Sequence, residues 1–340
     1  MANLFLGVDI GKGTQDIVVP DFSLNEENWP KAILPSPTEK LARKVEELSG
    51  DIGVCGYVMG GGPVKRALVN HLKRGFSVRI TERAARTIRD DIDEVKRLGF
   101  EVVDSLERCD VYLSDLETET YQRILWSIDR GLELPQFTVG IACQDHGFVK
   151  GQSDRVTRFR YLRELLERER RPEKMVVTEK TGFFTRFDSV LEQLSEMGLK
   201  GFVMDSKIAA VAGMVGYAKR FGVKEFVVLD VGNGHTLGAS VRRGEVVGLF
   251  EHHTRMLDGK KLELLVGKLV RGELSFEEVF EDGGHGAVVF ERIEPERVFV
   301  VGPNRRLAAG VGEEAYPLGD AMLYGCAGLV EAFRFLTSED

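Results

Sequence analysis

Residues 7–19 read GVDIGKGTQDIVV: an apolar segment, a turn with two glycines, and a second apolar segment. Residues 226–241, FVVLDVGNGHTLGASV, repeat this pattern. Asp9, Gly11 and Gly13 of the first copy are matched, without a gap, by Asp230, Gly232 and Gly234. A third predicted strand and a helix follow in both copies. The repeat therefore predicts two halves of one architecture.

The D-x-G-x-G turn has residues that suit phosphate binding. Glycines allow positive φ and let backbone N–H groups approach a ligand, and several inward-pointing N–H groups form an anion site. A carboxylate at the end of the incoming strand can hold Mg²⁺. One such hairpin alone would be read as an ordinary glycine β-turn. Two in register favour a site in which the turns hold the phosphates of a nucleotide from both sides.

The rest of the chain alternates predicted strands and helices, which indicates an α/β fold. We expect an N-terminal domain at 1–205, with an extended α/β portion near 77–200, and a C-terminal domain at 206–340. A second echo sets YVMGGGPVKRA at 57–67 beside FVVGPNRRLA at 299–308.

These motifs resemble the superfamily of sugar kinases, heat-shock chaperones and actin ATPases. GVDIGKGT and VLDVGNGHT are similar to its two phosphate motifs, VFVVGPNRR to its adenosine motif, MDSKIAAVAGMVGYA to its connecting segment and GDAMLYGCAGL to its closing helix. The resemblance implies a duplicated ribonuclease-H-like fold with ATP and Mg²⁺ in the cleft between halves. The implied cofactor-binding residues are Gly11, Lys12, Gly13, Thr14, Gln15, Asp230, Gly232, Asn233, Gly234, His235, Thr236, Gly302, Pro303 and Asn304.

The sequence departs from the superfamily pattern at two places. Asn233 and His235 stand where glycine or a small residue is commoner, and Pro303-Asn304 replaces a second glycine.

A closer resemblance is to a prokaryotic family of unknown function. Its phrases GTQDI, PSPT, MGGGP, QDHG, VGN-HTL, FEHHT and GHG occur here at 13–17, 35–38, 59–63, 144–147, 231–237, 250–254 and 284–286. Members are sometimes labelled as pyruvate formate-lyase activating enzymes, which implies a radical enzyme with a CxxxCxxC loop. The four cysteines here form no such loop, so we reject that activity.

Five of the six histidines are predicted at strand ends or in glycine turns: His146, His235, His252, His253 and His285. Either local hydrogen bonds satisfy them separately, or two or three converge as ligands of a transition metal or as acid/base groups. Because adjacent strand residues point to opposite faces, only one of His252 and His253 should enter the cleft. Asp9 and Asp230 are the candidate Mg²⁺ ligands.

Asp145, Asp9 and His146 are the candidate catalytic residues. Asp145 follows a predicted strand, where kinases of the superfamily often place a catalytic carboxylate, and would accept a proton from the attacking hydroxyl or water. The alternative is an Asp that opens an Asp-x-Gly turn.

The sequence thus favours an ATP-dependent small-molecule kinase, phosphotransferase or ATPase. The alternatives are a nucleotide-gated binding or activator protein and a histidine-metal enzyme that does not use ATP. The third glycine of GxGxxG is missing and no GxxxxGK[ST] occurs, which disfavours Rossmann and P-loop folds.

The composition of the chain argues against some classes of binding partner. The net charge of −8 argues against general binding to nucleic acid or anionic membrane, and no apolar run is long enough for a transmembrane helix. We expect a cytoplasmic protein with a small-molecule substrate of unknown identity. Its four widely spaced cysteines should be reduced, mostly buried thiols.

Overall fold

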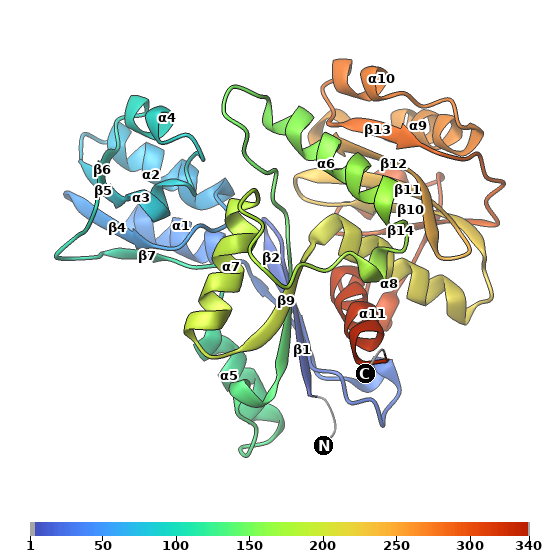
Figure 1. Ribbon diagram of the computed structural model, residues 1–340, viewed down its shortest axis with the longest axis horizontal. Helices are drawn as coiled ribbons and strands as arrows, with labels where there is room; N and C mark the ends of the chain where they lie inside the picture. Colours follow the sequence, from blue (N-terminus) through green and yellow to red (C-terminus); the bar gives the residue numbers. More distant parts are fainter. Residues whose placement is uncertain (1–3, 339–340) are drawn as a thin grey trace.

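A computed structural model describes residues 4–338 as three β-sheets with helices against their faces (Figure 1). Two of the sheets repeat one strand order and the third belongs to an insertion in the first half. Within the described range, no helix is both long and apolar enough to cross a membrane.

The first sheet has the strand order β3-β2-β1-β8-β9. β1 pairs antiparallel with β2, and β2 with β3, whereas β1, β8 and β9 run parallel. Parallel strands need crossovers, and the long segments before β8 and β9 supply them. The strands are β1 (Phe5–Ile10), β2 (Thr14–Val18), β3 (Lys31–Pro35), β8 (Thr138–Cys143) and β9 (Lys200–Asp205).

The second sheet, β13-β12-β11-β10-β14-β15, contains the same arrangement with one added edge strand. β10, β11 and β12 form an antiparallel meander, and β10, β14 and β15 run parallel. This confirms the duplicated ribonuclease-H-like architecture of the actin-like ATPase fold. The strands are β10 (Glu225–Val231), β11 (His235–Arg242), β12 (Glu245–His253), β13 (Gly286–Val289), β14 (Arg297–Val301) and β15 (Glu313–Glu314).

The predicted correspondence between the segments 57–67 and 299–308 is wrong. β14 pairs parallel with β10, just as β8 pairs with β1, so the counterpart of the segment after β14 is the one after β8. The segment 57–67 instead follows β4, a strand of the third sheet. Gly-rich ends of buried parallel strands look alike in sequence, whichever sheet they belong to.

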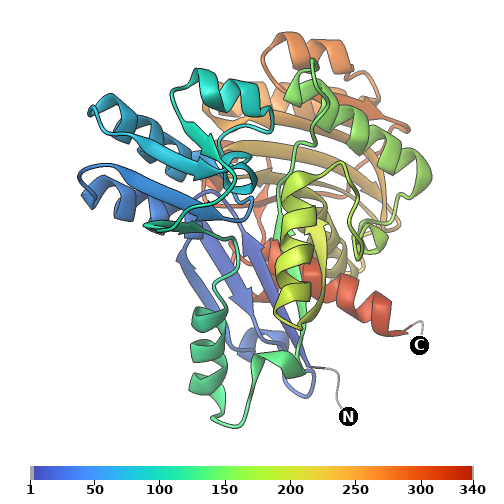
Figure 2. The same cartoon turned by 60° about the vertical axis from the view of Figure 1, so that its left-hand side comes forward.

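The third sheet, β6-β5-β4-β7, is wholly parallel and carries its own small core. It stands at one end of the first sheet, with α5 at the other (Figure 2). This α/β addition begins earlier than the expected 77–200. Its elements are α1 (Pro37–Glu47), β4 (Ile52–Gly56), α2 (Gly62–Lys73), β5 (Val78–Thr81), α3 (Glu82–Ala85), α4 (Ile92–Arg97), β6 (Glu101–Val103) and β7 (Val111–Leu113).

A disulfide joins Cys55 of β4 to Cys109, just before β7. The expectation of four reduced thiols is therefore wrong for this pair. The two cysteines are far apart in sequence, and only the parallel pairing of β4 with β7 brings them together. Cys143 and Cys326 are free and buried, as expected.

The two halves meet through helices α8 and α11. A methyl group on Gly213 of α8 would lie 2.2 Å from the Tyr324 carbonyl oxygen, and one on Gly328 of α11 would lie 1.8 Å from that of Ala209. Only glycine permits this close crossing. The remaining helices are α5 (Thr118–Ile128), α6 (Asp154–Arg168), α7 (Thr185–Glu196), α8 (Ser206–Arg220), α9 (Gly259–Arg271), α10 (Phe276–Glu281) and α11 (Tyr324–Ser338).

Helix α11 crosses from the second half onto the first sheet, where the Phe333 ring stacks on Phe5 with centroids 4.4 Å apart. The first sheet ends at Asp205 and the second begins at Glu225, with α8 between them. The division into domains at 205/206 stays a prediction.

Candidate functional site

The two glycine turns of the repeat face each other across one cleft. A methyl group on Gly13 would lie 2.7 Å from Nδ2 of Asn233, which belongs to the opposite turn. The turns close alike, by a bond from Gly11 N–H to the Thr14 carbonyl (2.9 Å) and from Gly232 N–H to that of His235 (3.1 Å). Both turns line a cavity of about 1200 Å³, which also reaches the insertion.

Three carboxylates lie at the base of this cleft: Asp9, Asp16 and Asp230. Each is at most 6% exposed. Lys207 donates to Oδ2 of Asp230 at 2.5 Å and to the His235 carbonyl at 3.0 Å. The Oδ1 atoms of Asp16 and Asp230 are buried without a hydrogen-bond partner. If all three carboxylates were ionised, their negative charge would exceed what the neighbouring Lys207 neutralises.

Burial is the largest cause of the pKa shifts of these groups. Burial, and next the carboxylates of Asp16 and Asp230, raise the pKa of Asp9 well above its ordinary value. Burial raises the pKa of Asp16 to about 7 against an opposing hydrogen bond from Thr14. A divalent cation would favour the ionised forms of both groups.

The sequence pattern did not identify Asp16 as a residue of the cleft, and the expected role of Gln15 in cofactor binding is wrong. Asp9 and Asp16 are register partners across β1 and β2, so their side chains share the cleft face of the sheet. Gln15, the next residue, points to the opposite face, where it is fully buried and contacts Glu117 and Tyr121. The hairpin spacing of seven residues was the signal that could have identified Asp16.

Thr236 in the second turn is likewise not a cofactor-binding residue. Its side chain is fully buried and pairs with the Thr254 hydroxyl at 3.0 Å, and it does not line the cleft. The other turn residues named above do line it: Gly11, Lys12, Gly13, Thr14, Asp230, Gly232, Asn233, Gly234 and His235.

Of the three residues in the expected adenosine motif, only Pro303 lines the cleft. Asn304 lies behind the second turn, where its Nδ2 donates to the Gly232 carbonyl (3.1 Å) and to Asn233 Oδ1 (3.3 Å). Gly302 lies beside the turn strand, since a methyl group there would be 2.7 Å from the Val231 carbonyl oxygen. These two residues support the second glycine turn.

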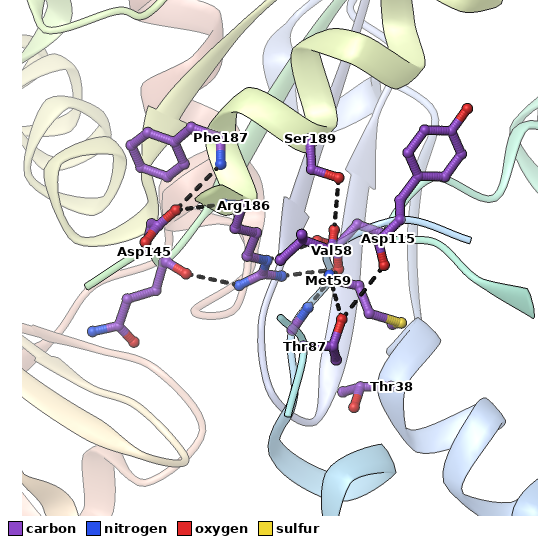
Figure 3. A network of polar contacts seen from close by, with 12 residues as sticks. Thr38, Val58, Met59, Thr87, Asp115, Asp145, Arg186, Phe187 and Ser189 are labelled. Carbon is purple, nitrogen blue, oxygen red and sulfur yellow. Dashed lines mark hydrogen bonds and ion pairs between the residues drawn. The ribbon is translucent and has the colours of Figure 1, made fainter. Parts of the chain in front are cut away.

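Asp145 lines the cleft, but both oxygens of its carboxylate already accept hydrogen bonds from backbone N–H groups. Oδ1 accepts from Gly147 N–H (2.8 Å), which confirms the Asp-x-Gly turn. Oδ2 accepts from the N–H groups of Arg186 (2.7 Å) and Phe187 (3.3 Å) in the first turn of α7 (Figure 3). Burial nevertheless raises its pKa to about 6. The general-base role stays a prediction, and these bonds give Asp145 a helix-capping role.

Four histidines from four separate segments gather on one wall of the cleft: His146, His235, His253 and His285. Ring centroids lie 4.7 Å apart for His235 and His285, 5.6 Å for His146 and His285, and 6.0 Å for His146 and His235. Burial lowers the pKa of His146 to about 3, of His235 to about 2 and of His253 to about 4. These three imidazoles are neutral at pH 7.

His252 does not join this group, so its inclusion among the metal ligands is wrong. Strand alternation turns it to the other face of β12, where it is fully buried. One ring nitrogen lies 2.9 Å from Asp282 Oδ2 and the other 3.3 Å from the His253 carbonyl oxygen. Both nitrogens are therefore used locally.

The insertion supplies the outer wall of the cleft, with Gly60, Gly61, Gly62, Lys65, Arg86 and Arg89. Arg186 of α7 fixes this wall: its Nε and one Nη bind the two Asp115 oxygens at 2.7 and 3.0 Å (Figure 3). Asp115 in turn accepts from Gly60 N–H at 3.2 Å. The other Nη of Arg186 donates to the Gln144 carbonyl at 2.9 Å. This one guanidinium thus ties the insertion to the loop after β8.

The family model described as "Putative pyruvate format-lyase activating enzyme (DUF1786)" matches residues 59–307. The chain belongs to this family. The matched segment covers the insertion from α2 onward, the second glycine turn, and His146, His235, His253 and His285. No curated protein matches the sequence.

Solved structures are similar to this chain over nearly its whole length. Ethanolamine utilization protein EutJ from Carboxydothermus hydrogenoformans is 14% identical, with 97% of this chain and 90% of that chain covered and a TM-score of 0.38. The inorganic polyphosphate/ATP-glucomannokinase from Arthrobacter sp. strain KM is 13% identical, with 99% and 100% covered and a TM-score of 0.40. The order of the strands in the first two sheets identifies the fold.

The activity in the DUF1786 description does not fit the cysteines. Cys55 and Cys109 are bonded to each other, and Cys143 and Cys326 are buried on β8 and α11. An iron–sulfur cluster needs several thiolates at one place. The arrangement of cysteines therefore does not provide one.

Proposed function

We propose that the protein binds ATP with Mg²⁺ between its two glycine turns and acts as an ATPase or as a kinase of a small molecule. The observation that carries the proposal is the pair of D-x-G-x-G turns that face each other above Asp9 and Asp230. Backbone N–H groups that do not close the turns would bind phosphate from both sides, and Lys12 lies between the second turn and the start of α2.

The residues at the base fit a magnesium ion. Mg²⁺ prefers carboxylate oxygens and keeps several waters, and Oδ1 of Asp230 is a buried acceptor without a partner. Asp9 and Asp230 would hold the ion, with Asp16 near them. When bound, it would offset the negative charge of the phosphates.

The remainder of the cleft suits an acceptor substrate. It lies between the insertion and the second half, and its walls carry Lys65, Arg86, Arg89 and Arg155. These cations suit an anionic or polar small molecule. Lys65 is half-buried, and burial lowers its pKa to about 8.

The test is calorimetry and phosphate release with ATP, with and without Mg²⁺, on the wild type, Asp9→Asn and Asp21→Asn. Asp9→Asn should keep the fold and lose about 3 kcal/mol of transition-state stabilisation, as expected for a preorganised electrostatic group. Asp21→Asn is the control, because Asp21 is exposed in the loop that follows β2. A folded wild type that gives no heat with any nucleoside triphosphate refutes the proposal. Binding without phosphate transfer points to the nucleotide-gated binding protein.

A further inference from the structure

We propose that His146, His235 and His285 form a binding site for a divalent first-row transition metal, separate from the magnesium position at Asp9 and Asp230. The inference does not depend on the proposed use of ATP. One ring nitrogen from each of the three histidines lies within 4.8 Å of the others. Ligands of a tetrahedral ion with bonds of about 2.1 Å are about 3.4 Å apart. Small side-chain rotations would therefore close the site.

The three ligands come from parts of the fold that are held independently. His146 follows β8 in the first half, His235 begins β11, and His285 precedes β13. The segments that carry these three histidines belong to both halves of the molecule, so a bound ion would join one half to the other.

A buried polar shell orients the imidazoles. Nδ1 of His235 lies 3.1 Å from Oε1 of Gln144, whose Nε2 donates to Oε1 of Glu251 at 2.7 Å. This leaves Nε2 of His235 available to an ion. Metal-bound histidines usually have such a partner on the second nitrogen, which fixes the tautomer and the ring orientation.

Two arginines hold the residues of this polar shell in place. Glu251 is fully buried and bonds to Arg158 at 2.7 Å. The carbonyl of Gln144 is held by Arg186, which Figure 3 places between Asp145 and Asp115. Gln144 is therefore positioned from its backbone as well as from its side chain.

One buried nitrogen of the cluster makes no hydrogen bond. His285 is 1% exposed, and its Nδ1 has no hydrogen bond although Glu251 Oε2 lies 3.5 Å away. A buried polar atom left in this way is costly, and coordination of a cation would satisfy it.

The donor set selects the class of metal. Imidazole suits zinc, copper, iron and nickel, whereas magnesium and calcium prefer oxygen ligands. Three protein ligands also leave a position open to the cleft, the arrangement of catalytic rather than structural sites. His253 lies beside the three, with ring centroids 4.9 Å from His235 and 5.0 Å from His285.

The experiment uses the full chain without a histidine tag, stripped with a chelator and titrated with Co²⁺ and then Zn²⁺. Elemental analysis should give one ion per chain, and Co²⁺ should develop visible absorption bands of nitrogen coordination. His146→Gln and His235→Gln, at half-buried positions, should each weaken binding at least about tenfold. Gln144→Ala should weaken binding about 10–100-fold without removing a ligand.

Two controls keep the test specific. His71→Asn removes one imidazole far from the cleft, in α2, and should leave Co²⁺ affinity unchanged. In Asp9→Asn the absorption bands of nitrogen-coordinated Co²⁺ should persist, which separates this site from the magnesium position.

Three results would overturn the inference: no Co²⁺ or Zn²⁺ bound by folded wild type, equal affinity in the wild type and in both glutamine variants, or a site that takes inorganic phosphate and no metal. Circular dichroism establishes folding in every case.

Discussion

Replacing Arg158 by methionine should destabilise the protein more than any ordinary surface change. Arg158 is 1% exposed and bonds to Asp205 at 2.7 and 3.3 Å and to Glu251 at 2.7 Å. Methionine keeps the apolar stem but leaves two buried carboxylates without their cation. Breaking a buried pair in this way costs about 3–5 kcal/mol, so we expect the free energy of unfolding to fall by that amount at pH 7.

The loss should depend on pH. Burial alone would raise the pKa of Glu251, but Arg158 and His285 hold it well below its ordinary value. In the wild type this low pKa contributes stability above about pH 4.3, the unfolded value, and the contribution is lost as pH falls through the folded value. In Arg158→Met the guanidinium no longer opposes the effect of burial, which raises the pKa of Glu251. Glu251 therefore takes up a proton at higher pH than in the wild type. The difference between variant and wild type should therefore shrink from pH 7 to pH 5.

Urea unfolding followed by circular dichroism at both pH values measures the effect. Arg163→Met is the matched control, because Arg163 lies on the same helix, is 62% exposed and pairs with Glu167 at 2.9 Å. Exposed pairs are worth about 0–1 kcal/mol. Equal unfolding midpoints for the two variants, or a loss for Arg158→Met that is the same at pH 5 and pH 7, would refute the reasoning.

Three further changes have expected outcomes. Gly325→Ala places a methyl group 1.9 Å from Oδ2 of Asp9, so it should displace this carboxylate and abolish Mg²⁺-dependent ATP binding in calorimetry; unchanged affinity contradicts the assigned position of the ion. Asp16→Asn removes a group whose pKa burial raises to about 7. In wild type with chelator present, the melting temperature should fall as pH rises from 5 to 8, and the variant should flatten that fall. Replacing Cys55 and Cys109 by serine opens a cross-link over a sequence separation of 54, which is worth about 4 kcal/mol. Hydrogen exchange should accelerate in the insertion and not in the second sheet.

The fold could be predicted because it depends on a repeat. Asp9 and Asp230 keep the same spacing to their glycines, and a hairpin with that spacing has one geometry in both halves. The position of the insertion could not be predicted in the same way. Its strands are as short and apolar as those of the main sheets, and only hydrogen-bonded register tells which sheet a strand joins.

The site was predicted where side-chain direction follows from strand alternation and missed where it does not. Alternation separates His252 from His253, and the same rule would have replaced Gln15 by Asp16. Asp145 shows the limit: its carboxylate is used by α7, which begins 40 residues further along the chain at Thr185. Such a contact has no local signal in the sequence.

The position of α11 has a consequence for biosynthesis. Its Phe333 and Cys326 cover the face of the first sheet, where the Cys326 thiol lies 3.0 Å from the Asp16 carbonyl oxygen. β1 is translated first and α11 last among the described elements, so this apolar face has no cover while the chain is still on the ribosome. The nascent first half therefore exposes part of its apolar surface until the last helix emerges, and such exposed surface favours aggregation during that interval.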